Sequence, residues 1–170
     1  ETTYGLVSFF ATLQGALTLL GLGLSSTLRR EFAVGEEDYE NRKRKYLLLR
    51  STENIYAVIA IIIMAVCFLG SNFISTRWLN IEELDPKVCS NAISLMGVSI
   101  GLQLISNLWF GCILGLGNQV FANACTVAWA ALKSVGSVII SILTRDVVLF
   151  YCCHIISDLL YLIVLRRFIS

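Results

Sequence analysis

Apolar stretches long enough to cross a bilayer dominate this chain, and short charged segments separate them. Hydrophobic residues make up 56% of the 170 residues and charged residues only 15%. A soluble domain of this size needs more polar surface, whereas a membrane helix needs about 20 consecutive, mainly apolar residues. The runs lack an alternation of period two, which argues against a transmembrane β-barrel. We therefore expect an all-α integral membrane protein.

About five transmembrane helices are expected, and they are expected to form most of one six-helix bundle. The predicted spans cover residues 5–28, 54–75, 91–114, 119–143 and 147–165. The charged segment 29–50 follows the first span, and its part from Glu36 to Arg50 is typical of an amphipathic helix leading into the second. Short turns at 115–118 and 144–146 join the last three spans. The second span is apolar nearly all round and is expected to face lipid.

Positive charge assigns each loop to a side of the membrane, because Lys and Arg gather in cytoplasmic loops. The segment 29–50 contains seven Lys and Arg residues, the loop 76–90 contains two, and the chain end contains Arg166 and Arg167. We therefore expect residues 29–50 and the C-terminus in the cytoplasm and the loop 76–90 outside. Residue 1 then lies outside, which predicts a preceding helix, a six-helix unit and a chain cut from a longer protein.

Lys133 lies near the middle of the fourth span, where a charged side chain costs about 2.5–3.5 kcal/mol on insertion scales. Such a residue normally faces protein or a water-filled path. Polar or small residues recur with it at spacings of three or four: Asn123, Thr126, Ala130, Ser137 and Ser141. One interpretation is a cationic patch that lines a path for an anionic substrate. The other is a lysine neutralised by a neighbouring helix.

The fifth span carries a second polar stripe, which consists of Tyr151, His154, Asp158 and Tyr161. His154 and Asp158 are four residues apart and share one helix face. Such a pair can carry a proton in a coupled transporter or form a structural hydrogen bond. Asp158 can also pair with Lys133, because the two lie at similar distances from the turn between their helices and hence at similar depth.

Further polar residues complete the candidate site. Gln103 belongs to a group of uncharged polar residues in the third span that can join helices or line a cavity. Arg50 and Glu53 are three residues apart at the start of the second span and can pair on the helix surface, either as a gate or as an ordinary salt bridge. Polar stripes in four of the five spans suit a bundle around a hydrated cavity.

The sequence supports no catalytic, metal-binding or nucleic-acid-binding function. No His, Cys, Asp and Glu residues have metal-ligand spacing, no nucleophile–base motif or phosphate-binding Gly-rich loop occurs, and no basic face remains outside the spans. We expect no enzyme activity and no cofactor. Only Cys89 of the six cysteines is near a polar loop, so we interpret them as small apolar packing residues rather than disulfide partners.

Six short stretches together carry a family resemblance. They are 4–6 (YGL), 22–33 (LGLSSTLRREFA), 48–56 (LLRSTENIY), 95–97 (LMG), 101–103 (GLQ) and 111–120 (GCILGLGNQV). In order and spacing they resemble the end of helix one through the turn after helix four of the polysaccharide and O-antigen flippases (Wzx type). These proteins belong to the multidrug/oligosaccharidyl-lipid/polysaccharide (MOP) exporter superfamily.

This resemblance implies a MATE-like transporter of two six-helix bundles around a central cavity, in which residues 1–170 supply helices two to six of the first bundle. It implies the flipping of undecaprenyl-diphosphate-linked oligosaccharide, such as O-antigen units, across the bacterial inner membrane by alternating access. The implied partners are this lipid-linked oligosaccharide, membrane lipids, the C-terminal half of the transporter and polysaccharide polymerase or assembly proteins. Lys133, with Arg145 and Arg50, would attract the diphosphate or acidic sugars.

Two other functions remain open. A drug or lipid exporter of the same superfamily would use Asp158 or His154 to couple transport to protons or sodium. A small tetraspan-like scaffold protein would be complete as it stands. The lysine at mid-membrane and the missing first helix count against the scaffold.

Overall fold

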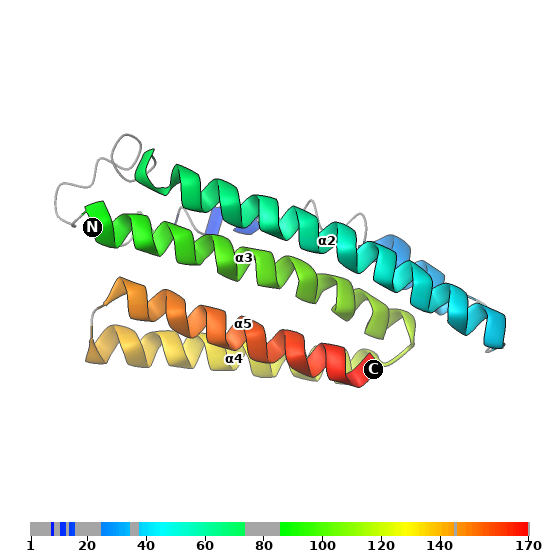
Figure 1. Ribbon diagram of the computed structural model, residues 1–170. Helices are drawn as coiled ribbons and strands as arrows, with labels where there is room; N and C mark the ends of the chain where they lie inside the picture. The colour runs from blue at the N-terminus through cyan, green and yellow to red at the C-terminus, as the bar shows by residue number, and fades with distance from the viewer. Residues whose placement is uncertain are drawn as a thin grey trace.

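Helices make up the described structure, a computed structural model that describes residues 8, 11, 12, 14, 15, 25–34, 38–73, 86–144 and 146–169. The long helices are α2 (Tyr39–Phe73), α3 (Pro86–Gly115), α4 (Gln119–Leu143) and α5 (Val147–Ile169) (Figure 1). A shorter helical segment covers residues 25–33. All four long helices are long and apolar enough to cross a membrane, and the described ranges contain no strand. The chain is therefore an all-α membrane protein, as predicted.

The predicted spans agree with the helices, with differences at their ends. The span 119–143 coincides with α4, and α5 begins at the predicted residue but continues to Ile169. The helix α3 begins at Pro86, before the predicted start at residue 91. The helix α2 joins the predicted span 54–75 and most of the segment before it into one continuous helix. Most of the predicted span 5–28 lies outside the described residues.

Local hydrogen bonds fix the end of α3 and the start of α5. After α3, Gly117 adopts a positive φ of 80°, the Asn118 amide donates to the Ile113 carbonyl at 3.2 Å, and the Gly117 amide donates to the Leu114 carbonyl at 3.1 Å. This is the Schellman pattern, in which glycine accepts the left-handed conformation without strain. Before α5, Asp146 Oδ1 accepts from the Val148 amide at 2.8 Å and caps the helix.

The helices pack in the lateral order α2, α3, α5, α4 (Figure 1). The helix α3 is central, because it packs along α2 on one side and along α5 on the other. Although a short turn joins α3 to α4, the two helices have little contact, since α5 lies between them. The polar face of α5 is consequently enclosed by α3 and α4 together.

The helix α2 buries only one stripe. Its buried residues include Tyr56, Ala60, Cys67 and Ser71, which face α3, whereas apolar residues such as Ile61 and Leu69 are exposed. One stripe of this helix is therefore covered by α3, and the rest of its apolar surface is exposed. The expectation that this span faces lipid stays a prediction, and exposed apolar surface is what a membrane helix presents to lipid.

Two Gly-x-x-x-Gly pairs on α3 allow its neighbours to approach closely. A Cβ atom at Gly97 would lie 2.5 Å from Cys67 Cβ, and one at Gly101 would lie 3.1 Å from Met64 Cε, both on α2. The second pair, Gly111 and Gly115, faces the backbone of the helical segment 25–33. Through these two glycine pairs, α3 makes close contacts with α2 and with the helical segment 25–33.

Candidate functional site

Asp158 of α5 is the centre of a buried polar network that joins three helices. Its side chain is 0% exposed. The carboxylate accepts hydrogen bonds from Ser99 Oγ and, at 3.1 Å, from Gln103 Nε2 of α3. From α4 it accepts the Trp129 indole N–H at 3.0 Å and Lys133 Nζ at 3.3 Å. A buried charge needs a partner and further hydrogen bonds, and α3 and α4 supply both.

Lys133 is neutralised within the bundle rather than presented as a free cation. Its side chain is 12% exposed, and its ammonium pairs with Asp158. The same ammonium lies 5.1 Å from the centroid of the Trp129 ring, within the range of a cation–π contact. The predicted Lys133–Asp158 pair is confirmed. Of the two interpretations of Lys133, the geometry matches the lysine that a neighbouring helix neutralises.

Gln103 extends the network toward the N-terminal part of the chain. Its amide nitrogen donates to Asp158 and, at 3.1 Å, to Ser99 Oγ. Its amide oxygen accepts from Gln14 Nε2. The predicted path residue Gln103 is therefore a link between two neighbouring segments and the buried carboxylate, which is the joining role of polar residues in membrane helices.

His154 lies on the same buried face of α5 as Asp158, one turn away. Its Nε2 is 2.8 Å from the hydroxyl of Ser137 on α4, and its ring packs against Phe150 with centroids 4.5 Å apart. The structure thus places the predicted site residues Ser137 and His154 in contact with each other. The predicted proton exchange between His154 and Asp158 stays a prediction.

A further rung of the α4–α5 interface joins Thr126 and Tyr161, whose hydroxyls are 3.0 Å apart. Tyr161 also stacks on Trp129, with ring centroids 4.9 Å apart. Together with the contacts of Asp158 and His154, this rung makes a ladder of polar contacts between the two helices. The ladder holds α4 to α5 at three levels along their length.

The Thr126–Tyr161 rung gives a measurable coupling. In a double-mutant cycle with Thr126→Val and Tyr161→Phe, we expect a coupling of about 0.6 kcal/mol, the usual value for polar contacts between membrane helices. Unfolding in mixed detergent micelles measures each variant. Thr52→Val is the matched control, because Thr52 Oγ1 donates to the Leu48 carbonyl of its own helix. A coupling of zero would show that the contact contributes nothing.

The predicted single stripe on α4 divides into two flanks. Thr126, Lys133 and Ser137 face α5, whereas Asn123 and Ser141 are exposed. An α-helix has 3.6 residues per turn, so Asn123 and Ser141, which are 18 residues apart, lie on the same edge of this stripe, whereas Thr126 and Lys133 lie roughly 60–80° around the helix axis on its other edge. Asn123 is therefore separated from the network, and Arg145 lies outside the described residues.

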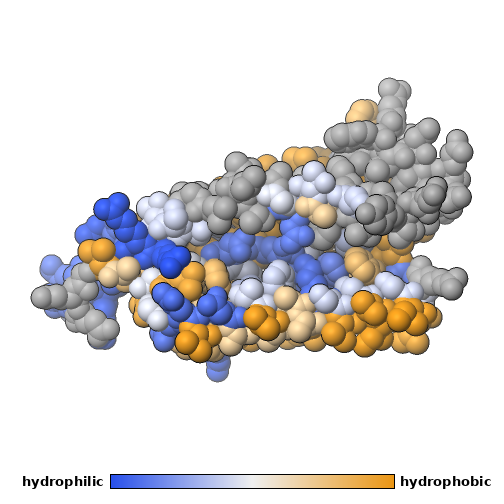
Figure 2. All heavy atoms as spheres, turned by 180° about the vertical axis from the view of Figure 1, so that it is seen from behind, coloured by the Kyte–Doolittle hydropathy of each residue, from blue (hydrophilic) through white to orange (hydrophobic). Residues whose placement is uncertain are grey.

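Figure 2 shows hydrophilic side chains in a band along the middle of one face, above a hydrophobic edge.

A second charged cluster joins α2 to α5. Arg50 Nη1 lies 3.2 Å from Glu53 Oε2, and Arg166 Nη2 lies 3.7 Å from Glu53 Oε1. The Arg166 guanidinium also lies 5.8 Å from the centroid of Trp109 on α3. The predicted Arg50–Glu53 pair is confirmed, and Arg166 is an addition. The sequence contained one signal for the contact of Arg166. This residue lies at the positively charged end of the fifth span, which is expected on the same side of the membrane as Arg50.

The described residues contain no group of three or more His, Cys, Asp and Glu side chains that could hold a metal ion. All six cysteines are free thiols. Cys67 and Cys112 are buried in helix contacts, in agreement with the interpretation as packing residues.

Comparison of the chain with protein-family models, with curated proteins and with solved structures finds no match. The resemblance to the flippases therefore stays a prediction. The structure shows an all-α membrane protein with a buried ion pair between α4 and α5.

Proposed function

We propose that this chain is part of a transporter that moves an anionic lipid-linked oligosaccharide, of the undecaprenyl-diphosphate class, across the bacterial inner membrane by alternating access. The Lys133–Asp158 ion pair inside the membrane-spanning helices is the observation that carries the proposal. Ionisable side chains within spans are costly, pair with one another and mark the routes of ions and substrates.

The depth of the pair supports this proposal. Lys133 is 14 residues from the start of α4 and 10 from its end, which corresponds to about 21 Å and 15 Å along the axis. The hydrocarbon core is about 30 Å thick, so the pair lies near its middle. A charge at this depth is remote from both aqueous phases. It can therefore contact only a substrate, an ion or water that enters the helix bundle.

The network allows Lys133 to exchange its counter-ion. When an anionic diphosphate approaches, the ammonium can turn from Asp158 toward the substrate. Asp158 then keeps the hydrogen bonds from Ser99, Gln103 and Trp129, which stabilise a carboxylate without a cation. A substrate that binds Lys133 thereby loosens the contact between α4 and α5. Alternating access requires such a differential contact between two states.

The cluster of Arg50, Glu53 and Arg166 is suited to gate one end of the path. It joins α2 to α5 through a single carboxylate, and both guanidinium side chains are 53% exposed. Exposed ion pairs contribute at most about 1 kcal/mol, so this contact can break and re-form during a transport cycle. In this proposal residues 29–50 and the C-terminus are cytoplasmic, and a second helical bundle completes the cavity.

Two alternatives differ in what the pair does. In a cation-coupled drug or lipid exporter, Asp158 would exchange Lys133 for a proton or sodium ion. In a scaffold protein, the pair would only hold the helices together. The number of donors around Asp158 suits a scaffold as well as a transporter, so a test must remove the charges without breaking the fold.

The double variant Lys133→Met/Asp158→Asn makes that test. It leaves no unpaired buried charge, and neutral replacement of a buried ion pair often preserves stability. We expect the full-length double variant to insert and fold but to give no surface polysaccharide in a bacterial strain that lacks its own flippase. Lys43→Met, an exposed lysine outside the pair, is the matched control and should complement fully.

The readout is the amount of surface polysaccharide at equal membrane protein levels. Normal polysaccharide with the double variant would mean that the pair is purely structural, and it would exclude the proposed role of Lys133.

A further inference from the structure

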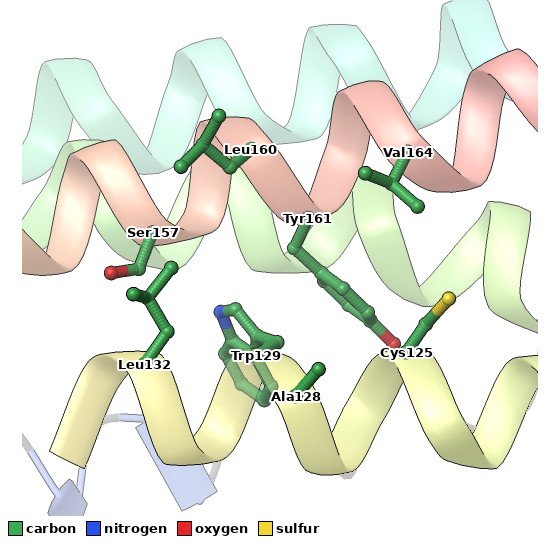
Figure 3. Close-up of a pocket in the computed structure, with 8 residues that line it drawn as sticks. All are labelled: Cys125, Ala128, Trp129, Leu132, Ser157, Leu160, Tyr161 and Val164. Carbon is green, nitrogen blue, oxygen red and sulfur yellow. The ribbon is translucent and has the colours of Figure 1, made fainter. Parts of the chain in front are cut away.

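An apolar groove of about 170 Å³ lies between α4 and α5. Its lining includes Cys125, Trp129, Leu132, Leu160, Tyr161 and Val164. Figure 3 shows the Trp129 and Tyr161 rings lying between the two helices. Ser157 also belongs to the lining, but its hydroxyl is already hydrogen-bonded, because Ser157 Oγ donates to the Cys153 carbonyl at 2.9 Å. The groove therefore offers hydrocarbon and ring surface.

The groove lies near the middle of α4 and opens onto exposed apolar side chains. Trp129 is 10 residues from the start of α4 and 14 from its end, or about 15 Å and 21 Å along the axis. The rims of the groove, Leu132, Leu160 and Val164, are exposed apolar residues, and no charged residue lines it. At this depth lipid headgroups are absent, and hydrocarbon chains are the surrounding solvent.

We propose that this groove binds one acyl chain of a membrane phospholipid and seats it against the ring of Trp129. The uncharged lining, the position near the middle of a membrane-spanning helix and the exposed apolar rim select a hydrocarbon chain over a headgroup or a polar ligand. Dispersion contacts with aromatic rings favour a chain that fills the groove over an empty space. The bound chain contacts the same side chain whose indole N–H donates to Asp158.

Fluorescence quenching by brominated phospholipids tests the site. In the full-length protein, the substitutions Trp78→Phe and Trp109→Phe leave Trp129 as the remaining tryptophan of residues 1–170. In vesicles, we expect bromines near the end of the acyl chain to quench Trp129 more than bromines near the headgroup. Ala128→Leu fills the groove, since Ala128 belongs to its lining, and should greatly reduce the quenching by deep bromines.

Ala131→Leu is the matched control, because Ala131 is an exposed residue of α4 outside the groove lining. It should leave the quenching unchanged. If the background variant fails to fold, the native protein is compared with Trp129→Phe, with and without Ala128→Leu, and the difference reports Trp129. Equal quenching in the Ala128→Leu and Ala131→Leu proteins, or no quenching by deep bromines, would overturn the proposal.

Discussion

Replacing Asp158 alone with alanine will lower the free energy of unfolding by about 3–5 kcal/mol, the usual cost of removing one partner from a buried ion pair. The substitution leaves the Lys133 ammonium, which is 12% exposed, without its carboxylate. It also removes the acceptor shared by Ser99, Gln103 and Trp129. Each buried donor left without an acceptor adds a desolvation cost.

Unfolding in mixed detergent micelles measures this loss. The Lys133→Met/Asp158→Asn protein is the control, because it keeps an acceptor at position 158 and leaves no isolated charge. We expect it to unfold close to the native protein. If Asp158→Ala and the double variant were equally stable, the network around Asp158 would not be a coupled unit.

Replacing Gly115 with alanine will have the second large effect, a loss of about 1–3 kcal/mol, as is usual for overpacking. A Cβ atom there would lie 2.7 Å from the Arg29 carbonyl oxygen and 2.7 Å from Phe32 Cβ. Because one of these is a backbone atom, the helical segment 25–33 must move away from α3. The neighbouring Gly111→Ala should cost less, since its nearest contact, the Ser25 carbonyl oxygen, is 3.0 Å away.

Gly15→Ala is the matched control for this prediction. No atom lies within 4 Å of a Cβ at Gly15, so alanine there should be neutral or stabilising by its higher helix propensity. The same micelle assay ranks the three variants. A Gly115→Ala protein as stable as Gly15→Ala would show that the close contact between α3 and the segment 25–33 does not form in the membrane.

The sequence predicted those features that depend on local geometry. The bounds of α4 follow from hydropathy and from the turns at both ends. The Lys133–Asp158 pair follows from two antiparallel helices, a short turn and equal distances from that turn. The Arg50–Glu53 pair follows from a spacing of three residues. Each of these inferences concerns one helix or two helices that are joined by a short turn. None requires knowledge of how the other helices are arranged.

The sequence did not predict features that depend on the lateral order of the helices. Ser99 and Gln103 reach Asp158 because α5 lies between α3 and α4, although a short turn joins α3 directly to α4. Hydropathy carries no information on that order. The Gly-x-x-x-Gly spacings on α3 were visible in the sequence, but the neighbour that each pair contacts was not.

The division of the α4 stripe has the same origin. Asn123 and Lys133 belong to one polar pattern in the sequence, yet Asn123 is exposed and Lys133 faces α5. The boundary between the two flanks is set by how α5 packs on α4, with Gly136 facing Cys153 Sγ across the interface. A wheel of one helix cannot locate that boundary.

Flipping of a lipid-linked oligosaccharide by the purified, full-length protein in proteoliposomes tests the proposed function most directly. Undecaprenyl-diphosphate-linked oligosaccharide is supplied on one leaflet, and its appearance on the other is followed with a membrane-impermeant sugar-modifying reagent. We predict translocation by the native protein and none by the folded Lys133→Met/Asp158→Asn protein. Absence of translocation by the native protein, or equal translocation by both, would contradict the proposal.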